Sequence, residues 1–255
     1  MPSLSKSTTI LVLALANGLA QPGNSPSFDV ASVKALPPTV LHGGNFQVTP
    51  ASISFHGYPL GFMIRWAYGL HPYQAFETVG PSWLEPGLGC VRFDVVGKAD
   101  HPVPVEQLRM MLRTLLTERL KLSLHRGTME MTVAAISVGK DGEKLHPSEE
   151  GDMTFSAEGD VMHFKGALFS RLDEWLYQFV PYLVVDETGL HGRYDFDLNV
   201  FQYRDFASPP APGNRIDLAS AVNKALQPLG LKLELKRRSV EVLMVDHAEK
   251  IPTEN

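Results

Sequence analysis

Cysteine is almost absent from this chain, and its scarcity excludes several ways of building or using a protein. Cys90 is the single thiol among 255 residues, so the chain cannot form a disulfide with itself and carries no Cys-x-x-Cys motif. The sequence also lacks the HExxH, GxSxG, GxGxxG and P-loop patterns that mark zinc proteases, many hydrolases and nucleotide-binding proteins. Its stability must therefore come from packing. None of these short motifs indicates a catalytic or binding chemistry.

Positive charge is scarce as well. Lys and Arg number 23 against 28 Asp and Glu, which gives a net charge of −5. A mildly acidic surface repels phosphate, so nucleic acid is not expected as a partner. Of the nine histidines, no two stand two or four residues apart, the spacing at which a strand or helix presents metal ligands.

These features predict no cofactor. Calcium is the alternative, because oxygen-rich loops suit this cation, although neither loop has the ordered spacing of a calcium-binding motif. The two loops that offer such oxygens contain His146, Glu149, Glu150 and Asp152, and Asp186, Glu187 and Asp195.

Long apolar runs are missing beyond the first twenty residues. Lys6 precedes an apolar run over residues 10–16, and the small residues Gly18 and Ala20 follow it. This pattern predicts a secretory signal peptide over residues 1–20 and a secreted or periplasmic protein. Since a membrane-spanning helix needs roughly 20 apolar residues, no transmembrane segment is expected in the mature chain.

An internal repetition is what the sequence does have. RFDVVGKA, which begins at Arg92, returns as RYDFDLNV from Arg193. Apolar residues at helical spacing predict helices over 60–70 and 104–120 in the first half, and over 168–179 and 218–229 in the second. LKLSLHR over 120–126 and LKLELKR over 231–237 are each expected to open a closing hairpin, with residues 129–138 and 239–242 as the returning strands.

Several elements that recur in the same order are hard to obtain by chance, so we infer a duplication. The prediction is an α+β fold made of two tandem duplicated β-α-β-β-α-β-β units, each a mixed sheet with two helices. Residues 21–145 form the first unit with an N-terminal strand, and residues 146–255 form the second.

The motifs FDVASVK, IRWAYGL, GPSWL, RFDVVGKA and VVDETGLHGRYDF together resemble the secreted proteins of unknown function expanded in soil Acidobacteria of the Solibacter type. This resemblance covers nearly the whole mature chain and implies secretion, but no activity. Residues 162–245 are also loosely similar to the short N-terminal domains of secretins and TonB-dependent receptors, with Thr188, Gly189 and Leu190 at the turn. That similarity implies an envelope module that binds a peptide, a protein partner or a neighbouring domain.

Four aromatic side chains are the candidate ligand-binding residues, because aromatics often line ligand grooves. The alternative is that they simply fill the core. They are Trp66, Tyr68 and Trp83 in the first half and Trp175 in the second.

The repeated strand supplies the candidate catalytic residues. Asp94 and Asp195 each follow an arginine by two residues, so strand alternation places the Arg and Asp of each motif on one face, within reach of each other, where we expect cross-strand polar pairs. With His191, the two aspartates are the candidates for a metal-assisted site. Two functions therefore stay open, namely an envelope module that binds a peptide, a glycan, a small molecule or an envelope protein, and a secreted hydrolase of ester or lactone bonds.

Overall fold

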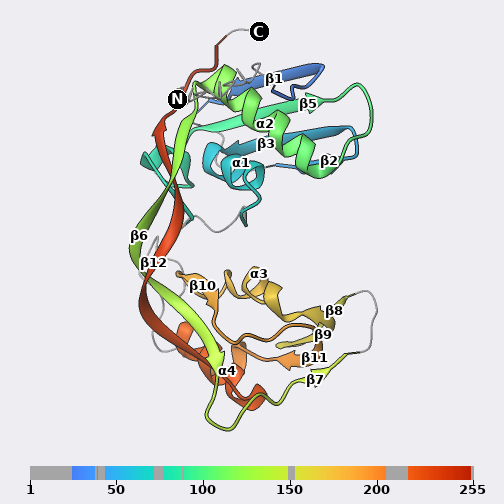
Figure 1. Cartoon of the computed structure of the whole chain (residues 1–255), viewed down its shortest axis with the longest axis vertical. Coiled ribbons are helices and arrows are strands. Elements are labelled where there is room, and N and C mark those ends of the chain that lie inside the picture. The colour runs from blue at the N-terminus through green and yellow to red at the C-terminus, as the bar shows by residue number, and fades with distance from the viewer. Residues whose placement is uncertain are drawn as a thin grey trace, which may run out of the picture.

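The computed structural model describes residues 25–37, 39, 44–71, 77–87, 89–148, 153–204 and 218–253. Helices and sheets are mixed, so the predicted α+β class is confirmed. Two lobes lie at opposite ends of a long two-stranded ribbon, with a gap between them on the other side (Figure 1). Within the described ranges, no helix is both long and apolar enough to cross a membrane. The predicted signal peptide, residues 1–20, lies outside the described residues.

The first lobe is a four-stranded antiparallel sheet with the order β1-β5-β3-β2 and two helices. Its second helix follows the predicted periodicity, with one apolar stripe buried from Leu108 to Leu120, and it ends at Lys121 in the left-handed conformation (φ 51°). The elements are β1 (Val30–Ala35), β2 (Phe46–Thr49), β3 (Ser52–Pro59), α1 (Leu60–Ala67), β5 (Arg92–Lys98) and α2 (Val105–Leu120), with a 3-10 turn at Ser82–Leu84.

The second lobe repeats this strand order as β7-β11-β9-β8, again antiparallel. The helix predicted over 168–179 is shorter than expected, because β9 continues to Leu168 and a 3-10 turn, Phe169–Arg171, precedes α3. The elements are β7 (His146–Pro147), β8 (Thr154–Glu158), β9 (Val161–Leu168), α3 (Asp173–Leu176), β11 (Arg193–Leu198) and α4 (Ala219–Leu226), with 3-10 turns at Phe201–Tyr203 and Gln227–Leu229. The equal strand order is an observation, whereas the duplication itself stays an inference.

The ribbon contradicts the predicted hairpins. β6 (Ser123–Val138) and β12 (Leu231–His247) are each one continuous strand, and they pair with each other in antiparallel register along their length. Gly127, where a turn was expected, is extended, and a Cβ there would lie 2.8 Å from the Met244 sulfur on the partner strand. Each strand therefore continues straight and finds its partner in the other half of the chain.

Two short strands extend the ribbon at opposite ends. β4 (Thr78–Val79) from the first half pairs in parallel with β12, and β10 (Leu183–Asp186) from the second half pairs in parallel with β6. The sheet order is thus β10-β6-β12-β4.

Each lobe also takes part of its core from the other half of the sequence. Leu243 and Val245, near the end of β12, are buried in the first lobe. Ala134 and Ile136, near the end of β6, are buried in the second lobe. The two cores therefore cross the boundary between residues 145 and 146, and each half of the chain completes the packing of the other.

Candidate functional site

The repeated Arg-aromatic-Asp motif holds a bulge in the neighbouring strand. Asp94 is the single residue opposite two residues of β3, His56 and Gly57, and the register shifts there. The Gly57 N–H donates to Asp94 Oδ1 at 2.9 Å, and Arg92 Nη1 donates to the Gly57 carbonyl at 2.8 Å. Gly57 has a φ of 71°, which favours glycine. Both backbone polar groups of this one glycine are therefore held by one motif.

The second copy of the motif makes the same contacts. The Gly166 N–H donates to Asp195 Oδ1 at 2.8 Å, and Arg193 Nη1 donates to the Gly166 carbonyl at 2.7 Å. Gly166, with a φ of 62°, lies in an equivalent bulge. The Gly166 N–H and the Ser148 hydroxyl lower the pKa of Asp195. The polar contacts of the Arg and Asp run across the strands, as expected, but in both described motifs the partner is the backbone of a glycine and not another side chain.

We expect Asp94→Ala to lower the free energy of unfolding by about 1 kcal/mol, because the buried Gly57 N–H loses its acceptor while the partly exposed carboxylate was already hydrated. Asp195→Ala should change stability in the same direction. Urea denaturation at pH 7 measures both losses, with Asp100→Ala, an exposed aspartate, as the control. Equal stability of Asp94→Ala and Asp100→Ala would contradict the role of the motif.

The structure separates the predicted catalytic residues. Asp94 lies on β5 in the first lobe, whereas Asp195 lies on β11 in the second. His191 is an exposed residue just before β11. In the described part of the chain, no three His, Cys, Asp or Glu side chains are grouped so that they would hold a metal ion. The constellation that sequence reasoning proposed for a hydrolase is therefore not assembled by the fold.

The oxygens of the predicted calcium loops have other partners where they are described. Asp186 Oδ1 accepts hydrogen bonds from the Thr188 N–H and hydroxyl, at 2.8 and 2.6 Å. Glu187 binds Lys236 at 3.0 Å and Arg238 at 2.8 Å. The acidic residues of the other loop, Glu149, Glu150 and Asp152, lie outside the described residues, so calcium binding stays a prediction.

The four candidate aromatics serve packing in two different cores. Trp66 and Trp83 are buried in the first lobe, and Tyr68 lies beside them under the guanidinium of Arg113, 4.4 Å from the ring centre. Trp175 borders the second core and stacks on Phe155, with ring centres 4.4 Å apart. The described structure does not gather these rings into one ligand groove.

A cleft between the lobes is the better candidate for a site. Its volume is about 480 Å³, and residues from both lobes line it. In Figure 1, α3 at the edge of the second lobe faces the first lobe across this gap. The lining residues are Gly69, Leu70, His71, Glu77 and Arg109 from the first half, and Arg171, Asp173 and Glu174 from the second.

Glu77 and His71 meet on the first-lobe wall of the cleft. The His71 backbone N–H donates to one oxygen of the Glu77 carboxylate. The other oxygen, Oε2, is buried and has no hydrogen-bond partner among the described residues. Burial raises the pKa of Glu77 and lowers the pKa of His71. Both side chains are therefore shifted toward their neutral forms, a pattern that is concentrated at functional sites.

Arg109 reaches the same wall from α2. Its guanidinium lies over the Trp66 ring, 5.6 Å from the ring centre, and forms an ion pair with Glu106. Gly69, with a φ of 74°, turns the chain after α1, and a Cβ there would come within 3.4 Å of an Arg109 nitrogen. Trp66 therefore packs against Arg109, a residue of the cleft wall, and does not itself line the cleft.

A buried ion pair lies next to this wall. Arg65 on α1 is 2% exposed, and its guanidinium binds both carboxylate oxygens of Glu85, with Nη2 and Oε2 2.9 Å apart. A side chain at Gly61 would collide with the Glu85 carboxylate. The positive charge of Arg65 acts on the pKa values of both His71 and Glu77, lowering each.

The second-lobe wall is formed by the short segment around α3. Arg171 binds both carboxylate oxygens of Glu174, at 2.7 and 2.6 Å, and Asp173 adds a further negative charge. The Tyr177 ring contacts the His71 ring of the opposite wall in a tilted arrangement, with ring centres 4.9 Å apart. This contact joins the two walls at the cleft.

Sequence reasoning missed the cleft because its residues come from separate elements in both halves of the chain. The signal that was available is Arg65, a charged residue inside the otherwise apolar run of α1. A charge at a core position needs a buried partner and is often found near a site.

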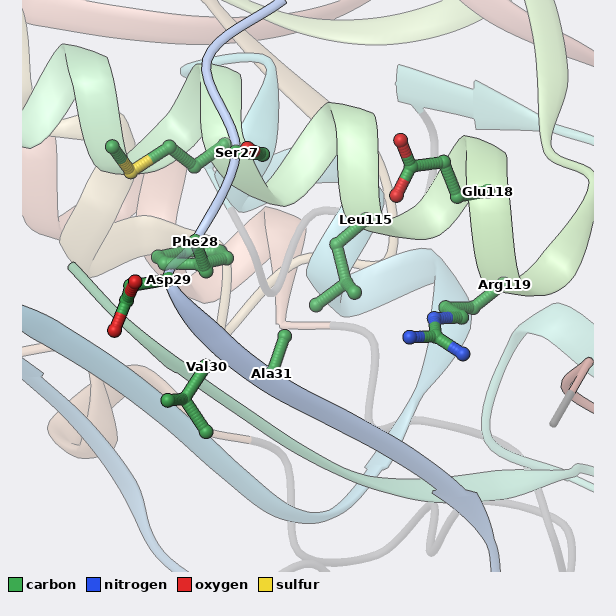
Figure 2. Close-up of a pocket in the computed structure, with 9 residues that line it drawn as sticks. Ser27, Phe28, Asp29, Val30, Ala31, Leu115, Glu118 and Arg119 are labelled. Atoms are coloured by element: carbon green, nitrogen blue, oxygen red, sulfur yellow. The ribbon is translucent and has the colours of Figure 1, made fainter. Parts of the chain in front are cut away.

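A second hollow, of about 310 Å³, lies within the first lobe, between the start of β1 and α2. In Figure 2, Leu115 points from α2 toward Ala31, while Glu118 and Arg119 lie further along the same helix. Phe28 packs against Gly97, where a Cβ would come within 2.7 Å of the ring. This hollow is the smaller of the two and is lined by one lobe only.

The comparisons with known proteins place the chain in a family but not in a functional class. A family model described as a protein of unknown function, DUF3738, matches residues 62–248. The match spans both walls of the cleft. Neither the search of curated proteins nor the search of solved structures found a match. The predicted membership in an uncharacterised family is confirmed at this level.

Proposed function

The chain belongs to DUF3738, a family of unknown function, and we propose that it is a secreted or periplasmic binding module whose cleft holds a peptide or another small polar ligand. The observation that carries this proposal is the cleft of about 480 Å³ whose walls come from both lobes. Concave sites between structural units, with a few convergent polar groups, are where small ligands bind most often.

The chemistry of the walls supports a binding role. Glu77 and His71 carry shifted pKa values, and Arg109 presents a buried Nε that lacks a hydrogen-bond partner within the described residues. Polar groups that are buried without partners cost free energy, and a ligand that bonds to them recovers part of that cost. The site is therefore prepared for a polar ligand at the expense of stability.

The extracytoplasmic location rests on the signal-peptide pattern over residues 1–20 and on the resemblance to secreted proteins of soil Acidobacteria. The looser resemblance to the N-terminal domains of secretins and TonB-dependent receptors favours an envelope protein or peptide as the partner. A glycan is the alternative ligand.

A secreted hydrolase of ester or lactone bonds is the alternative function. Its proposed residues, Asp94, Asp195 and His191, lie in two lobes, so no geometry of the described residues favours it. Turnover of chromogenic esters or lactones that disappears with EDTA would support this alternative over the binding module.

We expect a ligand of the cleft to raise the melting temperature by roughly 5–10 °C at about 100 times its Kd, because it binds only the folded chain. Screening dipeptides, tripeptides and short oligosaccharides by thermal denaturation measures this shift. Leu70→Trp, which places an indole in the cleft, should abolish the shift, whereas Leu235→Trp, an exposed position on β12, should retain it. A ligand that stabilises Leu70→Trp as strongly as the natural chain would contradict binding in the cleft.

A further inference from the structure

We propose that the ligand of the cleft carries a primary ammonium group and that this group binds against the buried Oε2 of Glu77. The inference rests on the proposed binding function and adds the chemical class of the ligand.

Among the described residues of the cleft, every arginine already forms an ion pair with a carboxylate, so none is offered to an anionic ligand. Each guanidinium at or next to the cleft already has a carboxylate partner within ion-pair distance, so the positive charges are compensated in place. The pairs are Arg65 with Glu85, Arg109 with Glu106, and Arg171 with Glu174.

The group of the cleft that lacks an ion-pair partner among the described residues is an acid, Glu77. Its carboxylate accepts a hydrogen bond from the His71 backbone N–H, and its Oε2 has no donor there. The charged groups that act on it are Arg65 from α1, which lowers its pKa, and Asp173 from α3, which raises it. Arg65, whose charge acts on Glu77 more strongly than that of Asp173, is itself ion-paired with Glu85. A cation in the cleft would pair with the Glu77 carboxylate and give Oε2 the hydrogen bond that it lacks.

The arrangement suits an ammonium group better than other cations. A guanidinium prefers two parallel acceptor oxygens, but one oxygen of Glu77 already accepts from His71. A hard divalent cation takes six or more oxygen ligands, and no group of three His, Cys, Asp or Glu side chains that would hold a metal is found in the described part of the chain. An ammonium group is a compact charge. One of its N–H groups can donate to a buried acceptor, and the other two can donate to water or to carbonyl oxygens.

A matched pair of probes tests this inference. N-acetyl-lysine methylamide carries the ammonium group, and its Nε-acetylated form has the same backbone without the charge. In amide ¹H–¹⁵N titrations of the full chain at pH 7, we expect the charged probe to shift the resonances of Gly69, Leu70 and His71. The acetylated probe should bind weaker by on the order of tenfold to a hundredfold, the loss that removal of a charged hydrogen bond produces.

Glu77→Gln separates binding from folding. The variant should weaken binding of the charged probe by a similar factor and yet melt at a higher temperature than the natural chain at pH 7, because a carboxylate whose buried Oε2 has no hydrogen-bond donor destabilises the fold. Glu130→Gln, which removes an exposed charge on β6, should change neither quantity.

The possible outcomes distinguish the two proposals. If both probes shift the cleft resonances equally, or if Glu77→Gln binds the charged probe as well as the natural chain does, the ammonium inference is overturned while the binding function stands. If the cleft resonances respond to neither probe and to no member of the peptide and oligosaccharide panel, both proposals fail. A melting temperature that falls in Glu77→Gln would show that Glu77 is structurally paired, and that result also overturns the inference.

Discussion

Glu85→Ala is expected to lower the free energy of unfolding by about 3–5 kcal/mol. Arg65 is 2% exposed, and the carboxylate of Glu85 binds its guanidinium through both oxygens. Removal of the carboxylate leaves the buried guanidinium of Arg65 without its Glu85 partner. Because Glu85 is itself 25% exposed, some water enters the space it leaves, so we expect a loss near the lower end of this range. Chemical denaturation at pH 7 measures it.

Two further variants serve as controls that separate the loss of a buried charge partner from the loss of an ordinary surface ion pair. Replacing both partners, as Arg65→Met with Glu85→Leu, should recover most of the lost stability, because the desolvation cost disappears together with the charge. Glu241→Ala breaks an exposed pair with Arg126 and should cost no more than about 1 kcal/mol. Equal losses in Glu85→Ala and Glu241→Ala would contradict the buried character of the Arg65 pair.

Leu243→Ala is expected to lower the free energy of unfolding by about 2–5 kcal/mol through the first lobe, although Leu243 belongs to the second half of the sequence. The side chain lies near the end of β12, inside the core formed by β3, β5 and the first two helices. Its truncation leaves a cavity there. Hydrogen exchange should consequently accelerate most in β3 and β5, and less in β9 and β11.

Leu231 provides a matched control on the same strand. It begins β12 and is buried in the second lobe, so Leu231→Ala should accelerate exchange in β9 and β11 instead. If Leu243→Ala accelerated hydrogen exchange mainly in the second lobe, the conclusion that β12 completes the core of the first lobe would be wrong. Such a result would mean that each half folds on its own residues.

The local elements were largely predictable because the periodicity of apolar residues reports which face of an element is buried. The stripe from Leu108 to Leu120 predicted α2, and the alternation after Arg92 and Arg193 predicted β5 and β11. Periodicity does not report which element covers that face. The sequence pattern predicted two strands joined by a turn around residue 127, whereas residues 123–138 form one continuous strand. Its partner β12 lies far away in the sequence, so local periodicity could not indicate the pairing.

The sequence by itself determined the α+β class, the order of the main elements and the repetition of the Arg-aromatic-Asp motif. Only the tertiary structure decided what that motif does, because its contact is a glycine peptide on a neighbouring strand. The cleft likewise required the fold. His71, Glu77, Arg109 and Glu174 come from separate segments of both halves, and the pKa values of His71 and Glu77 are shifted mainly by burial. Burial depends on what packs around a residue, and no local pattern in the sequence contains that information.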